Sequence, residues 1–373
     1  GNGKIIWFHG ASVGEIKSII PILEKLEKNQ RIKKILITSN TLSSSKIIKQ
    51  IKLKKIVHQF FPIDTNFLSD KFINYWRPTC VFFIDSEIWP NTFINLQKNG
   101  IPINLINGRI TKKTFLKWNI FPNFAKSLFS KFNLCLSSSN ESKRFLIKLG
   151  AKKVKFLGNL KFSETEKKDY ETDNVLKKYF SSKKIWCASS THKNEEIFCG
   201  RIHIELKKKY KNLTTIIIPR HVERVSSIIS ELSKYDLKIH TYGTKEKKIL
   251  PNTDIYIVDA YGKTKTFYNY CKIVFLGGSL INHGGQNPLE AARFGCNILH
   301  GPNVSNFNEI YKFLRTNNVS KKVTNFHSML FSLKKLFLKK DNSRKIKKKL
   351  TKVGKKILEN TYQEINILLK NEI

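Results

Sequence analysis

Acidic residues are scarce in this 373-residue chain: 28 Asp and Glu stand against 68 Lys and Arg, which gives a formal net charge of +40 at pH 7. An excess of this size predicts an anionic partner, which can be a phosphorylated substrate, a membrane surface or a nucleic acid. Lys, Ile and Asn dominate wherever alternatives exist, so part of the excess is compositional. The charge therefore does not choose among these partners.

Other features are missing altogether. No stretch reaches the roughly 18 apolar residues that a membrane span needs, and no signal peptide is visible. None of the six cysteines forms a C-x-x-C pair, which is typical of a reduced, cytosolic protein without a structural metal site. There is no Walker A motif, no zinc-ligand spacing, no G-x-S-x-G elbow and no nucleic-acid module signature. We therefore expect no structural metal site, and no motif predicts a cofactor.

Short apolar runs alternate with amphipathic helical patterns along the chain, which predicts parallel α/β sheets. The expected strands are Ile5–His9, Lys34–Thr38, Ile56–Phe61, Cys80–Asp85, Pro102–Ile106, Leu134–Ser137, Lys184–Ser189, Thr214–Ile218, Lys238–Thr241, Ile255–Val258, Ile273–Leu276 and Cys296–His300. The expected helices are Ile16–Lys28, Ser44–Lys49, Ser69–Trp76, Asn91–Asn99, Asn140–Leu149, Asn194–Lys209, Glu223–Leu232, Thr264–Tyr270 and Asn287–Phe294.

A polar, charge-dense stretch divides this pattern into two halves. We expect an N-terminal Rossmann-like domain over residues 1–162, a linker over 163–183, a C-terminal Rossmann-like domain over 184–345 and a basic helix over 346–373, with a cleft between the domains. The apolar stripe of the basic tail either packs on its own domain or lies on an anionic membrane.

A glycine-rich run, Gly277–Glu290, follows the apolar stretch Ile273–Leu276 and leads into a helix near Pro288. Its four glycines let the backbone approach a ligand, the helix start suits a phosphate, and Glu290 can accept hydrogen bonds from ribose hydroxyls. The run predicts a nucleotide site at the carboxyl edge of a sheet. The alternative is local capping, with Asn287 as N-cap, Pro288 at N1 and Glu290 at N3.

Acidic motifs follow two of the expected strands. Glu15, in the run His9–Glu15, can act as a general base on a substrate hydroxyl, but Ser12 and Glu15 also match a capping box. Asp85 and Glu87 resemble a motif that holds a metal–nucleotide in some glycosyltransferases, but Asp85 can equally cap the next helix.

Three further segments carry candidate ligand contacts. Arg220 offers a planar fork for a phosphate and His221 a second donor, although a solvated basic loop has the same composition. The hydroxyls of Ser190 and Thr191 can line a nucleotide site, or Thr191 can cap a helix. Lys161 means little by itself in so basic a chain.

Taken in order, these motifs resemble one family, the 3-deoxy-D-manno-octulosonic acid (Kdo) transferases of lipopolysaccharide synthesis. The strongest are Glu87–Asn91 and Gly284–Glu290. The full set spans roughly residues 5–310 and comprises His9–Glu15, Phe61–Asp64, Glu87–Asn91, Asn107–Arg109, Gly158–Phe162, Ser190–His192, Pro219–Arg224, Gly277–Ala292, Gly301–Pro302 and Asn306–Phe307.

The resemblance implies a GT-B fold, transfer of Kdo with inversion from CMP-Kdo to a lipid A precursor (lipid IVA), and a place on the cytoplasmic face of the bacterial inner membrane. It implies no bound metal, so the metal interpretation of Asp85 and Glu87 is dropped. Glu15 matches the general base, and Glu87 and Lys161 match positions that stabilise the transition state. The CMP-contacting positions match Arg220, His221, Tyr261, Gly262, Lys263, Gly277, Gly278, Ser279, Asn287, Pro288, Leu289 and Glu290.

Some residues depart from the family pattern. Lys263 stands where an acidic residue is usual, Gln286 where His is common and Gly108 where Ala is common. In the family a hydrophobic anchor usually precedes the first strand, and this sequence shows none. Either the protein attaches to the surface of an anionic membrane without an anchor, or the chain is truncated. Acceptor docking is expected around Ile16–Ile22 and Lys46–Lys55. The competing hypotheses are a GT-B enzyme with another nucleotide sugar and a nucleic-acid-binding protein; we expect no nucleic-acid partner.

Overall fold

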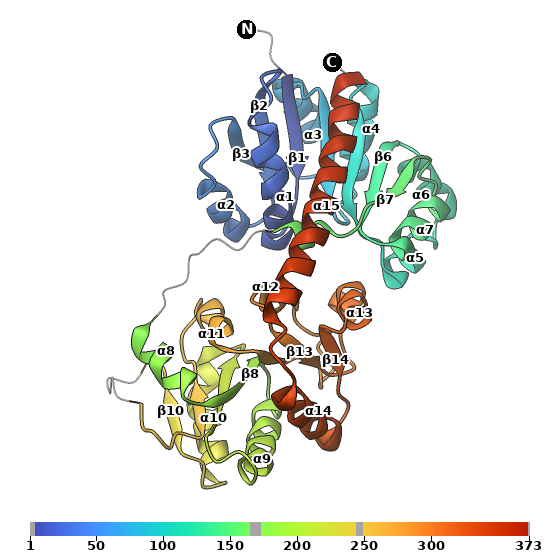
Figure 1. Cartoon of the computed structure of the whole chain (residues 1–373). Coiled ribbons are helices and arrows are strands. Elements are labelled where there is room, and N and C mark those ends of the chain that lie inside the picture. The colour runs from blue at the N-terminus through green and yellow to red at the C-terminus, as the bar shows by residue number, and fades with distance from the viewer. Residues whose placement is uncertain (1–3, 165–172, 244–248, 372–373) are drawn as a thin grey trace. The chain divides into compact units, whose positions relative to one another are not determined.

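The computed structural model describes residues 4–164, 173–243 and 249–371. The chain divides into two compact units (Figure 1). The first unit comprises residues 1–165 and 351–373, and the second comprises residues 166–350. Each unit is an α/β domain built on one parallel sheet.

The first unit holds a seven-stranded parallel sheet in the order β3-β2-β1-β4-β5-β6-β7. Its strands are β1 Lys4–His9, β2 Ile32–Ser39, β3 Ile56–Phe60, β4 Cys80–Ile84, β5 Ile103–Gly108, β6 Phe132–Ser137 and β7 Val154–Phe156. All residues of β4 and β5 are buried, as expected for central parallel strands that are covered on both faces.

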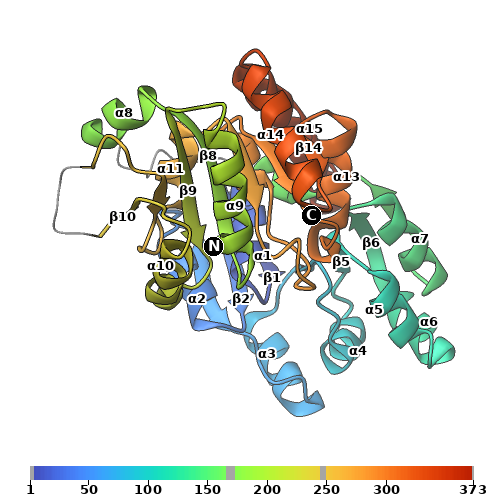
Figure 2. The same cartoon turned by 90° about the horizontal axis from the view of Figure 1, so that it is seen from below.

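Helices cover both faces of this sheet (Figure 2). They are α1 Val13–Leu26, α2 Leu42–Lys49, α3 Asn66–Trp76, α4 Pro90–Lys98, α5 Lys112–Trp118, α6 Pro122–Phe129 and α7 Asn140–Lys148, followed by the 3-10 turn η1 Leu160–Ser163. Trp7, Phe83 and Phe93 belong to the apolar core that joins the helices to the sheet.

The second unit repeats the arrangement with the strand order β10-β11-β9-β8-β12-β13-β14. Its strands are β8 Lys184–Thr191, β9 Leu213–Pro219, β10 Ile239–Thr241, β11 Ile255–Ile257, β12 Ile273–Leu276, β13 Asn297–His300 and β14 Ser320–Lys322. Its helices are α8 Asn174–Ser181, α9 Glu195–Lys207, α10 Val225–Ser233, α11 Thr264–Tyr270, α12 Leu289–Arg293, α13 Asn308–Thr316 and α14 Phe326–Leu338, with the 3-10 turns η2 Val222–Arg224 and η3 Ser305–Phe307.

The terminal helix α15, Ser343–Asn371, starts in the second unit and belongs to the first unit from Thr351 onward. Its apolar stripe is buried at Ile357, Ile365 and Leu369. Two ion pairs fix it at the surface of the first unit: Lys25 Nζ lies 2.7 Å from Glu359 Oε2, and Lys155 Nζ lies 2.8 Å from Glu364 Oε2. In the structure the tail therefore packs its stripe on protein, and the helix begins before residue 346.

Every strand expected from the sequence is present, with ends that differ by a few residues. The sequence pattern missed β7 and β14, which are three-residue edge strands with two exposed residues each and carry no apolar run. It also missed α5, α6, α8, α13 and α14. Helix α8 lies inside the range expected as a linker, and residues 165–172 of that range are outside the described residues.

Two capping predictions have different outcomes. The Asn287 side chain accepts from the Leu289 N–H (3.1 Å) and Pro288 has helical dihedral angles, so Asn287 caps the first turn as predicted, although α12 is regular only from Leu289. Thr191 does not cap α9, whose N-cap is Asn194 in the left-handed region. Within the described ranges, no helix is both long and apolar enough to cross a bilayer.

Candidate active site

The carboxyl edge of the first sheet gathers most of the unit's candidate catalytic groups. Glu15 follows β1, Asp85 and Glu87 follow β4, and Arg109 follows β5. Shifts in two pKa values show that these groups share one electrostatic environment. Asp85 and Glu87 raise the pKa of Glu15, and Arg109 and Lys161 oppose the upward shift of the Asp85 pKa that its burial causes. The structure thus brings together Glu15, Glu87 and Lys161, which lie far apart in the sequence.

Glu15 is both a cap and a candidate base. Ser12 is the N-cap of α1, and its hydroxyl donates to Glu15 Oε1 (2.7 Å), while the Ala11 N–H donates to Glu15 Oε2 (2.8 Å). Burial raises the pKa of Glu15 to about 7, with repulsion from Asp85 and Glu87 adding to the shift and the Ser12 and Ala11 hydrogen bonds opposing it. A carboxyl group with this pKa can accept a proton near neutral pH.

A chain of hydrogen bonds orients Glu87. Trp7 Nε1–H donates to Thr38 Oγ1 (2.8 Å), and Thr38 Oγ1 lies 2.9 Å from His9 Nδ1. We infer that the Thr38 hydroxyl donates to Nδ1, which places the ring proton of His9 on Nε2, 3.3 Å from Glu87 Oε2. Trp89 Nε1–H donates to the same oxygen (3.1 Å). Burial lowers the pKa of His9, so the ring serves as a neutral donor.

Strained backbone marks this edge of the sheet. Asp85 has φ 61° and Asn107 has φ 53°, in the left-handed region that non-glycine residues rarely occupy. Asp85 caps no helix, because the Asp64 carboxylate receives the Asn91 and Thr92 N–H groups at the start of α4. Asn107 Oδ1 accepts from the Leu160 N–H (2.9 Å), which fixes the segment that carries Lys161.

At the carboxyl edge of the second sheet, one buried carboxylate organises the glycine-rich loop. Glu195 is 2 % exposed and accepts from four backbone N–H groups. The donors and distances are His192 (3.0 Å), Gly278 (2.7 Å), Ser279 (3.3 Å) and Leu280 (3.1 Å). Burial raises the pKa of Glu195 and these hydrogen bonds counteract the shift. The carboxylate binds the N–H groups of the glycine turn, whereas the helix start that the sequence suggested for a phosphate is the start of α12.

The first residues of the glycine-rich loop therefore make hydrogen bonds within the protein. The Gly277 N–H donates to Ser189 O (2.8 Å), and a Cβ on Gly277 would lie 2.5 Å from Ser190 O. The Ser279 hydroxyl is buried and bonds to Leu276 O and the Gly301 N–H. Ligand contacts from Gly277, Gly278 and Ser279 would have to avoid these groups, and Leu289, which is fully buried, can offer only its main chain.

Three histidines meet where β8, β9 and β12 end. The ring centroid of His192 lies 4.3 Å from that of His283 and 6.1 Å from that of His221. Burial and the nearby His283 lower the pKa of His192 to about 4, and its buried Nε2 has no hydrogen-bond partner among the described residues. The adjacent Arg220 N–H donates to Thr191 O (3.0 Å). A ligand donor group would satisfy Nε2 at this position.

Glu223 joins two of the segments predicted to contact CMP. Its carboxylate receives the Tyr261 hydroxyl (2.9 Å) and lies 3.3 Å from His221 Nδ1. Gly262 adopts φ 78°, and Lys263 Nζ lies over the Tyr242 ring at 5.9 Å. Sequence patterns predict no ligand or catalytic role for Glu223, Glu195 or His9. For Glu195 no local signal exists, because three of its four donors lie more than 80 residues away.

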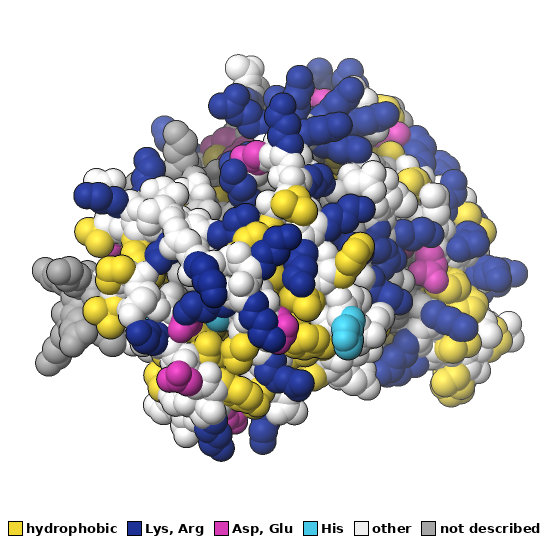
Figure 3. All heavy atoms as spheres, turned by 60° about the horizontal axis from the view of Figure 1, so that its bottom comes forward, with side chains coloured by type: hydrophobic (Ala, Val, Ile, Leu, Met, Phe, Trp, Pro, Cys, Tyr) yellow, Lys and Arg dark blue, Asp and Glu magenta, His cyan; other side chains and the backbone are white. Residues whose placement is uncertain are grey.

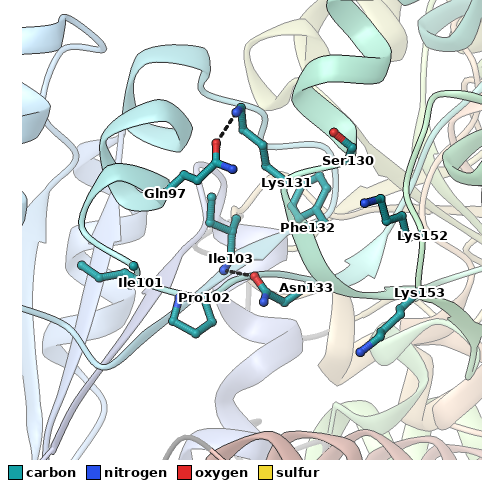
Figure 4. A pocket seen from close by; sticks show the side chains of 11 residues that line it. Gln97, Ile101, Pro102, Ile103, Ser130, Lys131, Phe132, Asn133, Lys152 and Lys153 are labelled. Atoms are coloured by element: carbon teal, nitrogen blue, oxygen red, sulfur yellow. Dashed lines mark hydrogen bonds between the residues drawn. The ribbon is translucent and has the colours of Figure 1, made fainter.

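Neither unit's candidate residues line the cavity drawn in Figure 4, whose volume is about 390 Å³. It lies at the start of β5 and β6, the amino edge of the first sheet, where the Ile103 N–H donates to Asn133 Oδ1 (3.0 Å) and Lys131 bonds Gln97. No group of three or more His, Cys, Asp or Glu side chains suited to a metal ion occurs in the part of the chain that is described.

Comparison with known proteins gives the same assignment as the motifs. Residues 1–164 match the family described as 3-Deoxy-D-manno-octulosonic-acid transferase (kdotransferase). The 3-deoxy-D-manno-octulosonic acid transferase of Rickettsia prowazekii is 34% identical over 92% of this chain and 74% of its own length. The chain belongs to the Kdo transferase family. It is a glycosyltransferase. The Kdo transferase of Haemophilus influenzae is 29% identical over 83% of this chain and 73% of its own length.

Solved structures establish the fold. The chain is similar to a putative UDP-N-acetylglucosamine 2-epimerase from Listeria monocytogenes, with a TM-score of 0.65 at 13% identity over 98% of this chain and 97% of that one. The UDP-GlcNAc 2-epimerase from Neisseria meningitidis gives 0.63 at 15% identity over 98% and 100%. At this identity the likeness concerns architecture alone, and it confirms the GT-B fold of the family member described here.

The Glu195 contacts lead to a stability prediction. Glu195→Ala leaves four N–H groups of a buried loop without their acceptor, and we expect the free energy of unfolding to fall by about 3 kcal/mol. Urea unfolding followed by circular dichroism measures the change. Glu205→Ala, on the exposed side of the same helix, is the control and should change stability by less than about 0.5 kcal/mol. Equal effects of the two substitutions would contradict the role of Glu195.

Proposed function

We propose that this enzyme transfers Kdo from CMP-Kdo to a lipid A precursor, with inversion at the anomeric carbon. The observation that carries the proposal is Glu15, whose pKa of about 7 suits a general base and is raised in part by Glu87. Lys161, the third position that matches the family's catalytic residues, acts on Asp85 at the same edge of the sheet. The family membership supports Kdo as the transferred sugar. The roles divide between the units, with the base in the first and the donor contacts in the second.

In the proposed reaction, Glu15 accepts the proton of an acceptor hydroxyl as its oxygen attacks the anomeric carbon of Kdo. A new C–O bond forms on the face opposite the leaving group, the bond from the anomeric carbon to the phosphate oxygen breaks, and CMP departs with the bonding electrons. Lys161 and Arg220 supply positive charge for the phosphate charge that develops. Glu87, fixed by His9 and Trp89, helps to keep the Glu15 pKa high enough for proton transfer.

A lipid acceptor requires contact with a membrane surface, and helices α5 and α6 offer one. Leu116, Ile120, Phe121 and Phe124 are 50–69% exposed where these two helices meet. No acidic residue occurs between Glu87 and Glu141, whereas this stretch carries several lysines. Apolar side chains amid basic ones favour binding at an anionic bilayer surface. We propose this α5–α6 surface as the contact with the cytoplasmic face of the inner membrane.

The docking position expected from the sequence was wrong in part. Ile16, Ile19 and Ile22 are completely buried in the core of the first unit and cannot touch a lipid. The apolar face of α1 packs against the sheet. An amphipathic pattern alone does not show whether such a face contacts a protein core or a membrane, which is why the sequence misplaced the docking surface.

The second candidate function is glycosyl transfer from another nucleotide sugar. It is favoured by one observation: three N–H groups of the glycine-rich loop already bind Glu195, so fewer groups of this loop are available to specify the nucleotide. Incubation with CMP-Kdo and with UDP-sugars in parallel separates the two.

The reaction is tested by transfer to a tetra-acylated, bis-phosphorylated lipid A precursor, with CMP-Kdo generated in the assay and products identified by mass spectrometry. Glu15→Gln removes the base and should lower kcat by about 10³-fold, within the range for general base catalysis. Glu24→Gln, on an exposed turn of the same helix, should retain full activity. Equal transfer by both variants would reduce Glu15 to a helix cap.

The pH dependence tests the state of Glu15. The base must be ionised, so kcat/KM should rise with pH to a plateau, with a midpoint at about pH 7. The Ser12 hydrogen bond stabilises the ionised form, so Ser12→Ala should raise the pKa and move this midpoint to higher pH. An unchanged midpoint in Ser12→Ala would contradict the assignment of the acidic limb to Glu15.

Vesicle binding tests the α5–α6 surface. Ile120→Ser combined with Phe121→Ser should weaken binding to phosphatidylglycerol vesicles by at least fivefold in a flotation assay, because two exposed apolar side chains lose their lipid contact. The control is Val175→Ser, which removes an exposed apolar side chain in the second unit. If the double variant and Val175→Ser lose vesicle binding equally, or if neither loses it, the α5–α6 surface is not the membrane contact.

A further inference from the structure

A basic hollow of about 650 Å³ lies at the amino edge of the second sheet, away from the candidate site. Its floor is formed where β13 and β14 begin, and its walls by the end of α14 and the start of α15. Five lysines line it, contributed by three elements and the segment after α14: Lys321, Lys335, Lys339, Lys345 and Lys349. No acidic residue lines it, and all of its residues belong to the second unit.

Few acidic residues accompany the lysines around this hollow in the sequence. Asp341 is the single acidic residue between Glu309 and Glu359, a stretch with 16 Lys and Arg. The Asp341 carboxylate lies 2.9 Å from Lys272 Nζ, which is not part of the lining. Lysine and arginine side chains likewise far outnumber acidic ones on the face shown in Figure 3. A concave surface of one sign concentrates the electric field and attracts ions of the other sign.

Helix α15, which forms one wall, carries basic side chains at positions where they lower the stability of the helix. Arg344 and Lys345 stand in the first turn of α15, at the positive end of the helix dipole, and the acidic residue beside this turn is Asp341, whose Oδ1 accepts from the Ser343 N–H (2.9 Å). Lys345 and Lys349 are one turn apart, a spacing at which like charges repel. An anion bound in the hollow would relieve both effects.

The floor is polar and ordered. Asn297 is 8 % exposed, and its Oδ1 accepts from Lys339 Nζ (3.3 Å) while its Nδ2 donates to Asn342 Oδ1 (2.9 Å). These bonds hold one of the five ammonium groups in place and connect the start of α15 to the sheet. The hollow is therefore a shaped cavity with a fixed base.

We propose that this hollow binds a ligand that carries two or more phosphate groups. A phosphate monoester bears about −1.5 to −2 charges at pH 7, so five lysines match roughly two or three of them. Lysines act as point charges, so they select for phosphate charge without a fixed bidentate geometry. The proposal does not depend on the transferase reaction, because none of the lining residues belongs to the candidate active site.

The phosphates can come from a free polyphosphorylated molecule or from a lipid headgroup, and two probes separate these sources. Inorganic tripolyphosphate, measured by isothermal titration calorimetry, reports free ligands. Vesicles with and without cardiolipin, whose headgroup carries two phosphates, report headgroups when their binding is measured by flotation. Each probe is applied to the full chain as wild type, as Lys339→Gln with Lys345→Gln, and as Lys340→Gln with Lys348→Gln.

The two double variants lose the same charge from the same part of the chain, but Lys340 and Lys348 do not line the hollow. We expect the lining pair to weaken binding of at least one probe by tenfold or more and the control pair to weaken it by less than threefold. Loss confined to tripolyphosphate assigns a free ligand, and loss confined to cardiolipin vesicles assigns a headgroup. Equal loss in both variants, or no binding of either probe by the wild type, would overturn the proposal.

Discussion

The parallel direction of the strands is the constraint on which the rest of this structure depends. Because every strand of a sheet runs the same way, the turns that leave β1, β4 and β5 all open at one edge, and those that leave β8, β9 and β12 open at one edge of the second sheet. Residues separated by scores of positions therefore meet without any long loop. Glu15 and Lys161 share an electrostatic environment with Asp85 for this reason.

Several of the scarce acidic side chains accept hydrogen bonds from backbone N–H groups of the chain itself. Asp64 receives the first N–H groups of α4, and Glu27 receives those of Lys54 and Lys55. Glu195 receives four from two separate loops. Asp173 caps α8. A carboxylate used in this way neutralises partial charges of the peptide groups and leaves the surface lysines uncompensated. The lysine and arginine charge of the molecule therefore lies at its surface, while these carboxylates are hydrogen-bonded to backbone groups in turns and at helix starts.

The fold was largely predictable because buried parallel strands are continuous apolar runs. The strands that escaped prediction, β7 and β14, lie at sheet edges and are short and charged, so they pair through backbone hydrogen bonds without an apolar signature. The candidate site was predictable to the extent that its residues follow strands. The orientation of Glu87 by His9, and of the glycine-rich loop by Glu195, depends on contacts between distant segments and has no counterpart in local sequence. The capping pattern failed at α9, whose N-cap is Asn194 in the left-handed region instead of Thr191.

Helix α15 makes the first unit discontinuous in the chain. Residues 351–373 complete it, and they follow the whole of the second unit. During synthesis at about 5–20 residues per second, the first unit waits roughly 10–40 s after its own strands have been made before Ile357, Ile365 and Leu369 can cover it. Its apolar surface remains open to chaperones or to wrong partners throughout that interval. The second unit is one continuous block of residues 166–350, so its chain is complete before the first unit receives its last helix.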